Sequence, residues 1–144
     1  MIEISPDPID PSVLRLRLPD PAAGAYCSFE GWVRNHNEGQ QVLRLEYEVY
    51  EPVARSEGER ILAEANARFP LLAAQCVHRS GELGIGDCAV WVGVTSAHRD
   101  EAFKACRFII DAVKLRLPIW KKEYYRDGHS GWVNCERCAG HNTG

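Results

Sequence analysis

The sequence lacks an excess of positive charge. Its 144 residues contain 17 lysines and arginines against 20 aspartates and glutamates, which gives a formal net charge of −3 at pH 7. General nucleic-acid binders carry a basic excess, so this composition argues against that class and against a nucleic-acid partner. A small basic pocket for a phosphorylated ligand stays compatible with it, because an average conceals local clustering.

Long hydrophobic runs are also missing. The chain begins with MIEIS, without a basic segment followed by an apolar one, and no run approaches the roughly 18 apolar residues of a membrane span. The sequence therefore predicts neither a secretory signal nor membrane contact, and we expect a cytoplasmic protein. In that reducing compartment the cysteines are expected to be free thiols.

A second pair of closely spaced cysteines is absent as well. Four of the six cysteines lie in apolar patterns typical of small core residues; these are Cys27, Cys76, Cys88 and Cys106. The other two, Cys135 and Cys138, have His141 nearby and resemble half of a zinc site, which needs four ligands. We therefore predict no metal site and a flexible tail over 134–144. A zinc-binding interaction module and a redox CxxC are the alternatives.

What is present is the pattern of one α+β domain over 1–144. Helices are expected at about 11–18, from Pro52 to the residue before Pro70, and at about 98–117. Strands are expected at 24–35, 42–50, 71–79, 88–96, 119–125 and 132–134. The first two strands flank a Gly-containing turn and are predicted to pair as an antiparallel hairpin. The glycines of 80–87 join strand to strand, which indicates a plain loop and not a dinucleotide-binding fingerprint.

The clearest helical pattern is the one at 98–117. A stripe at steps of three and four is predicted to face the core; it consists of Phe103, Cys106, Ile110, Val113 and Leu117. Lys114 borders this stripe. A lysine in that position either extends its ammonium to water, the commoner outcome, or presents it into a pocket.

Several cations stand at the ends of predicted elements. Arg34 follows a strand, and Lys121 follows the proline that ends the last helix. His98 and Arg99 stand at a helix N-terminus, where free N–H groups suit an anion; alternatively, His98 caps the helix and Arg99 points to water. If these groups converge with Lys114, crowding of like charges would favour a neutral amine, which is a candidate nucleophile or general base.

Five segments resemble a known family when they are taken together. They are GAYCSFEGWVRNHNEG, LEYEVYEPVA, HRSGELGIGD, GVTSAHRDEAF and the final stretch IDAVKLRLPIWKKE with DG and WV downstream. In this order, over about residues 20–133, they resemble the MoaE family, the large catalytic subunits of molybdopterin synthase. The combination of SAHR with K-x-x-x-P-x-W-K is the most specific part of the match.

The resemblance implies an α/β hammerhead fold with an additional antiparallel β-sheet, and a homodimer of large subunits. Each large subunit would carry a small ubiquitin-like sulfur carrier of the MoaD type, whose Gly-Gly tail ends in a thiocarboxylate. The expected reaction transfers two sulfurs to cyclic pyranopterin monophosphate and forms the dithiolene of molybdopterin. No metal or redox cofactor is implied.

Carried over position by position, the resemblance also assigns site residues. Lys114 and Lys121 match the catalytic lysines, whereas Lys122 is expected to face solvent. The substrate and anion pocket is matched by Arg34, His98 and Arg99 for charge and by Phe29 and Ile110 for its walls. Arg137 stands one position off the spacing expected for an arginine that reaches the partner protomer. The alternative function is a non-catalytic anion-binding scaffold for a ubiquitin-like partner, and the presence of both lysines argues against it.

Overall fold

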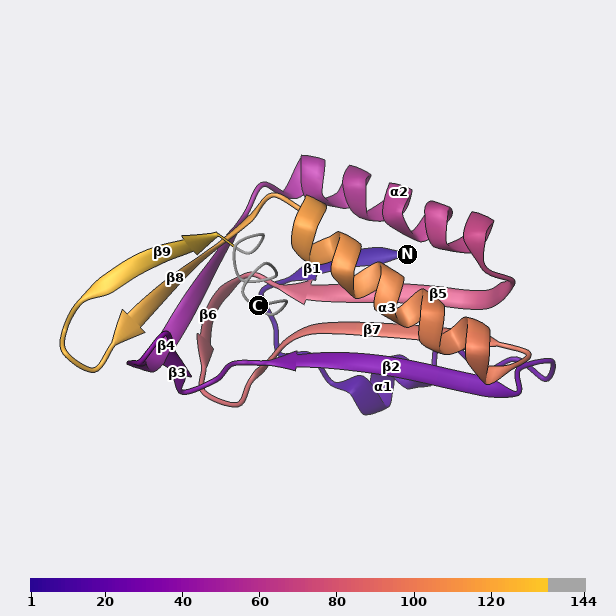
Figure 1. Ribbon diagram of the computed structural model, residues 1–144, viewed down its shortest axis with the longest axis horizontal. Coiled ribbons are helices and arrows are strands. Elements are labelled where there is room, and N and C mark those ends of the chain that lie inside the picture. Colours follow the sequence, from indigo (N-terminus) through magenta and orange to yellow (C-terminus); the bar gives the residue numbers. More distant parts are fainter. Residues whose placement is uncertain (135–144) are drawn as a thin grey trace.

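The computed structural model describes residues 1–134, which form two sheets with helices packed on the first (Figure 1). The helices are α1 (Pro11–Arg15), α2 (Glu51–Arg68) and α3 (Arg99–Arg116). The strands are β1 (Ile2–Ser5), β2 (Ala25–Trp32), β3 (His36–Asn37), β4 (Gln40–Val49), β5 (Leu71–Arg79), β6 (Gly81–Gly84), β7 (Cys88–Ser96), β8 (Ile119–Tyr125) and β9 (Ser130–Asn134). The α+β class and the additional antiparallel sheet are thus confirmed.

The first sheet has the strand order β1-β5-β7-β2, and its central strand β7 is apolar on both faces. Val90, Val92 and Val94 belong to the core cluster under α2 and α3. Trp91 points to the opposite face and packs with Leu14 of α1. Figure 1 shows α2 and α3 on one side of this sheet. The prediction that 88–96 is a strand buried on both faces is confirmed.

The α3 stripe was predicted almost correctly. Cys106, Ile110, Val113 and Leu117 are all buried. Phe103, however, is 64% exposed, so its predicted place in the core is wrong. The physical reason is that this turn of α3 lies over β2, which forms the edge of the sheet, and Phe103 borders a shallow hollow there.

The predicted hairpin between 24–35 and 42–50 is wrong. β2 pairs antiparallel with β7 in the first sheet, whereas β4 pairs with β3, β6 and β8 in the second. The intervening residues form their own tight pair, His36 opposite Gln41, which turns the chain into the second sheet. The segment 80–87 is likewise more than a loop, because its strand β6 pairs with β4.

Other predictions concern composition and the end of the chain. Within residues 1–134 no helix is long and apolar enough to cross a membrane, and no three His, Cys, Asp or Glu side chains group as metal ligands. The four cysteines of this part of the chain are free thiols. Asn134 belongs to β9 and not to the predicted tail. Cys135, Arg137, Cys138 and His141 lie outside the described residues.

Candidate active site

A pocket of about 590 Å³ lies where the second sheet meets the end of α3. Four of the predicted site residues line it: Phe29 from β2, Arg34 just after β2, Lys114 from the last turn of α3 and Lys121 from β8. Lys114 and Lys121 are brought together because α3 ends at Arg116 and the chain passes through Leu117 and Pro118 directly into β8. The structure therefore places Lys114 in a pocket wall.

The alternation of β8 separates its two neighbouring lysines. Lys121 stands opposite Tyr47 of β4, and both residues line the pocket. Successive side chains of a strand point to opposite faces, so Lys122 lies on the other face. Its ammonium stacks 5.3 Å from the ring centroid of Tyr124 and 5.6 Å from that of Trp132. Lys122 thus lies on the face of β8 opposite Lys121, as predicted, and it is half-buried over aromatic rings where solvent exposure was expected.

Ile110 lines a second cavity beside the pocket. It is buried, one turn before Lys114 on α3, and this cavity measures about 420 Å³. Phe29 and Lys114 border both cavities. The predicted apolar wall residues Phe29 and Ile110 therefore flank Lys114.

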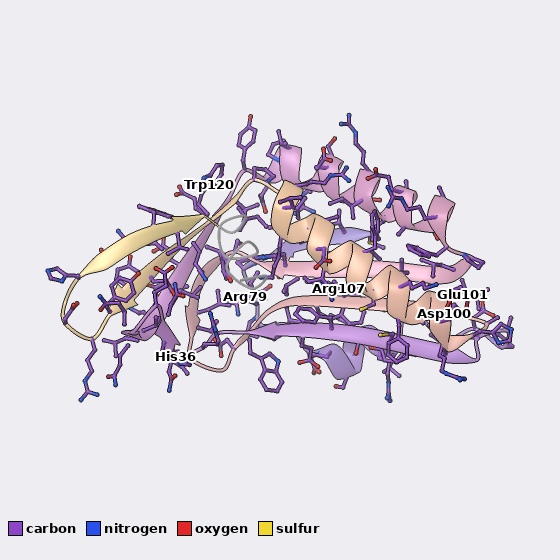
Figure 2. All side chains as sticks on the ribbon, in the orientation of Figure 1. His36, Arg79, Asp100, Glu101, Arg107 and Trp120 are labelled. Carbon is purple, nitrogen blue, oxygen red and sulfur yellow. The ribbon has the colours of Figure 1, made fainter. Side chains whose placement is uncertain are left out.

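His98 and Arg99 do not reach this pocket within one chain. They are exposed residues at the beginning of α3. Arg99 and Lys114 are 15 positions apart, and at 1.5 Å per residue this corresponds to about 22 Å along the helix. Figure 2 shows Asp100 and Glu101 at that distant end, whereas His36 of the pocket lies towards the other end. The convergence of all the predicted cations is thus not found inside a single chain.

One residue of the pocket escaped the sequence analysis. Glu123 is only 3% exposed, and its Oε1 accepts hydrogen bonds from Asn37 Nδ2 at 2.7 Å and from the Tyr125 hydroxyl at 3.3 Å. Burial, together with the neighbouring carboxylate, raises the pKa of Tyr125. The signal that could have found Glu123 is the period of two along β8, which puts it on the same face as Lys121.

A buried histidine lies close to the pocket. His78 of β5 is 6% exposed, and its Nδ1 lies 2.7 Å from the carbonyl oxygen of Arg79. Burial lowers the pKa of His78 to about 4, the hydrogen bond to Arg79 opposes this shift, and the charge of Lys114 adds to it. The ring also meets Tyr47 edge-on, with centroids 5.0 Å apart.

Comparison with known protein families identifies the family of this chain. The family model described as MoaE protein matches residues 4–116, which is most of the chain. The chain belongs to the MoaE family. The range matched by the MoaE model contains Arg34, His98, Arg99 and Lys114 and ends before Lys121.

Curated relatives extend the match beyond that range. A protein of Thermoplasma volcanium named molybdopterin synthase catalytic subunit is 40% identical over 131 residues, covering 91% of this chain and 96% of the relative. A protein of the same name from Synechococcus elongatus is 44% identical over 137 residues, covering 93% of this chain and 83% of its own. The similarity thus covers more than nine-tenths of this chain and most of each relative.

Solved structures agree on the fold. Molybdopterin synthase from Staphylococcus aureus superimposes with a TM-score of 0.86 at 37% identity, covering 91% of this chain and 95% of that one. A complex of subunits 1 and 2 of molybdopterin-converting factor from Helicobacter pylori gives a TM-score of 0.75 at 20% identity, which supports the fold alone. The MoaE fold expected from the motifs is thereby confirmed.

Proposed function

We propose that this chain is the catalytic subunit of molybdopterin synthase, a sulfurtransferase of molybdenum cofactor biosynthesis. The observation that carries the proposal is the pocket that unites Lys114, Lys121 and Arg34. The names of the relatives over nearly the whole chain support it. The substrate in this proposal is cyclic pyranopterin monophosphate, and the sulfur comes from the thiocarboxylate of a small ubiquitin-like subunit in the cytoplasm.

The residue types in the pocket suit this chemistry. The phosphate group of the substrate needs fixed cationic donors, and Arg34 in the lining of the pocket supplies one. Charge develops on oxygen when a thiocarboxylate carbon is attacked, and a positioned ammonium stabilises that oxyanion. Lys114 and Lys121 can supply that ammonium, and in its neutral form either amine can move a proton. The buried carboxylate of Glu123 balances part of this positive charge.

The small subunit enters as the sulfur donor. The Helicobacter pylori protein with this fold is in complex with the other subunit of molybdopterin-converting factor, and we infer a two-component enzyme for this chain as well. We infer that a Gly-Gly tail of the MoaD type threads towards Lys114 and Lys121. With two large and two small subunits the assembly would be a heterotetramer.

His98 and Arg99 lie far from the pocket of their own chain, and a homodimer would bring them to the pocket of the other copy. β2 forms the edge of the first sheet, and its exposed Phe29 lines the same cavity as the exposed Phe103 of α3. If a second copy packs antiparallel along β2 about a two-fold axis, the start of β2 in one copy lies beside the end of β2 in the other. His98 and Arg99 follow closely after Ser96, which pairs with Ala25 at the start of β2. They would then approach the other copy's pocket.

The function is tested by mixing the protein with thiocarboxylated small subunit and pyranopterin monophosphate and measuring molybdopterin. We expect wild type to convert the substrate and Lys114→Ala to bind the small subunit while losing nearly all turnover. Lys122→Ala is the matched control and should keep its activity, because Lys122 lies on the opposite face of β8. Full activity of Lys114→Ala would contradict the lysine mechanism, and binding without any turnover by wild type would favour the scaffold alternative.

The contribution of the second copy is tested by complementation. Arg99→Ala and Lys114→Ala are each expected to be impaired as homodimers. In a mixed dimer one of the two pockets would combine an intact Arg99 with an intact Lys114, so co-expression should restore part of the activity. If the mixed dimer is as inactive as the parents, Arg99 does not act across the interface.

A further inference from the structure

The turn that leads into α3 directly follows a fully buried serine. Ser96, the last residue of β7, is 0% exposed, whereas the three residues after it are all exposed. The flanking strands β2 and β5 place Ala25 and Leu71 in register with Ser96. The chain therefore passes in one step from the interior of the first sheet to the exposed turn that carries His98 and Arg99.

The hydroxyl of Ser96 fixes the backbone of this turn. Its Oγ donates a hydrogen bond to the carbonyl oxygen of His98 at 2.5 Å. His98 is the N-cap of α3, with an extended backbone at φ −130° and ψ 154°, and its side chain makes no capping hydrogen bond. The carbonyl of an N-cap also accepts the first hydrogen bond of its helix. One buried hydroxyl thus joins the end of β7 to the beginning of α3, and the imidazole of His98 takes no part in the cap.

A second contact holds the same turn. The backbone amide of Gly24 donates to the carbonyl oxygen of Ser96 at 3.0 Å. A Cβ at position 24 would lie 2.3 Å from the carbonyl oxygen of Ala97, which is closer than such atoms approach, so only glycine lets the two segments pass this near. The turn therefore lies between the hydroxyl of Ser96 and the backbone of Gly24.

A fixed turn matters when its side chains act on another molecule. Exposed connections are ordinarily mobile, and ordering a mobile segment at the moment of binding lowers the affinity. The contacts of Ser96 and Gly24 order the backbone of His98 and Arg99 before any ligand arrives. Since these two cations lie far from the pocket of their own chain, the site that gains from this order is the pocket of the other copy.

We propose that Ser96 is a positioning residue, which sets the direction in which His98 and Arg99 are presented to the pocket of the other copy. Gly24 assists, because it allows the close approach at Ala97. The effect on turnover rests on the proposed function and its homodimer, whereas the effect on the backbone of the turn does not. Ser96 acts in trans: a chain with a changed Ser96 keeps its own pocket and impairs that of its partner.

The backbone of the turn can be measured without any turnover. In Ser96→Ala the nitrogen-15 order parameters of the His98 and Arg99 amides should fall well below the value of about 0.85 that is typical of rigid backbone. Thr95→Val is the matched control, because Thr95 precedes Ser96 on β7, is 4% exposed, and has a hydroxyl without a hydrogen-bond partner within residues 1–134. Unchanged order parameters in Ser96→Ala would overturn the proposal.

Mixed dimers show on which pocket Ser96 acts. Homodimers of Ser96→Ala should lose about tenfold to 100-fold in kcat/KM for pyranopterin monophosphate, and Thr95→Val should lose nothing. In a mixed dimer of Ser96→Ala and Lys114→Ala chains, the pocket with an intact Lys114 receives its cations from the chain with an intact Ser96. Turnover should therefore return to that of one unimpaired pocket.

The reverse combination should give the opposite result. A chain with both substitutions has no lysine at position 114, and beside a wild-type chain it supplies the remaining pocket with a loosened turn. The turnover of that pocket should stay as low as in Ser96→Ala homodimers. If Ser96 served only the fold of its own chain, this wild-type pocket would be fully active and the mixture of single variants would stay impaired, which would overturn the proposal.

Gly24→Ala provides a second variant in case Ser96→Ala does not fold. It displaces the turn at Ala97 while the hydroxyl of Ser96 stays in place, and it should lower the order parameters and act in trans in the same way. A defect confined to the pocket of its own chain would contradict the proposal. If wild type makes no molybdopterin while the order parameters fall as expected, the proposed function fails and the role of Ser96 in the turn stands.

Discussion

At the scale of single residues, the candidate site depends on buried polar groups that the sequence conceals. Lys114, Lys121, Arg34 and Phe29 were predicted from their types and from the family motifs, and the structure brings them to one pocket. Glu123 was missed, because the period of two along β8 puts it on the face of Lys121 but does not reveal that its side chain is only 3% exposed. Burial of a charged residue is decided by its tertiary partners, which here are Asn37 and Tyr125.

Replacing Glu123 with glutamine should weaken both stability and turnover. The charged acceptor of the Asn37 amide is replaced by a neutral one. A hydrogen bond contributes about 1.5–3 kcal/mol when one partner is charged and about 0.5–1.5 kcal/mol when both are neutral, so the exchange costs about 1 kcal/mol. We expect a loss of this order in the free energy of unfolding, measured by urea titration, and a reduced rate of molybdopterin formation. Glu48→Gln, at an exposed position of β4, is the control. Equal stability of both variants would show that the buried charge is not needed.

His78 should also make stability depend on pH. Its pKa is about 4 in the folded protein against 6.5 for the free side chain, so between these values the unfolded chain binds a proton that the folded chain does not. The free energy of unfolding therefore falls as the pH drops through this window, with His78 contributing up to about 3 kcal/mol. In His78→Gln this part of the slope should vanish. The exposed His98→Gln should keep it, and an identical slope in all three proteins would contradict the buried neutral ring.

At the scale of elements, the sequence predicted most helices and strands but not their pairing. The spacing of apolar residues and the positions of proline and glycine are local properties of the sequence. For this reason β2, β4, β7 and α3 were recognised near their true bounds. Which strand lies beside which is decided by contacts between distant segments. β2 and β4 alternate in the same way and are close in sequence, yet they enter different sheets. The exposure of Phe103 has the same origin, because helical spacing cannot reveal where the sheet beneath ends.

An ion-pair cluster fastens α3 to α2. Arg116 in the last turn of α3 donates to Glu57 and Glu64 of α2, with Nε 2.9 Å from Glu57 Oε1. These contacts raise the pKa of Arg116, first through the bond to Glu57 and then through that to Glu64. The cluster lies two residues beyond Lys114, and it therefore also holds the end of the helix that carries the pocket lysine.

Removing this cluster should loosen the helix pair. Because the Arg116 side chain is 31% exposed, solvent weakens the pair, and we expect Arg116→Met to lose about 1 kcal/mol of unfolding free energy. Arg60→Met is the matched control, since Arg60 contacts the same Glu57 at 3.6 Å but is 72% exposed. Its effect should stay below about 0.5 kcal/mol in thermal or urea unfolding. Equal losses in both variants would mean that the cluster adds nothing beyond a surface pair.

At the scale of the whole molecule, the two groups of predicted site residues lie at opposite ends of α3. That separation is the strongest reason to expect that this chain forms a homodimer, in which each pocket receives His98 and Arg99 from the other copy. Phe103 is exposed beside the edge strand β2, and we propose that it belongs to the surface that a second copy would cover. Sequence alone could not separate the two groups, because it does not show which cations belong to which chain of an assembly.

A charge at this surface should break the dimer. Phe103→Glu would bury a carboxylate against apolar side chains, and we expect a monomer in sedimentation velocity, with turnover reduced as His98 and Arg99 are lost to the other copy. Leu115→Glu is the control, because Leu115 is 56% exposed and points about 120° round the helix from Phe103. A dimeric Phe103→Glu protein would place the interface elsewhere.

The five-stranded sheet is assembled from three separate segments of the chain. β3 and β4 leave the first sheet after β2, β6 leaves it between β5 and β7, and β8 and β9 follow α3. During synthesis the first sheet can therefore be complete while the second still lacks β8, the strand that carries Lys121 and Glu123. Pairings between distant segments form late and slowly. The scaffold is thus available before the pocket, because β8, which brings Lys121 beside Lys114, follows every strand of the first sheet along the chain.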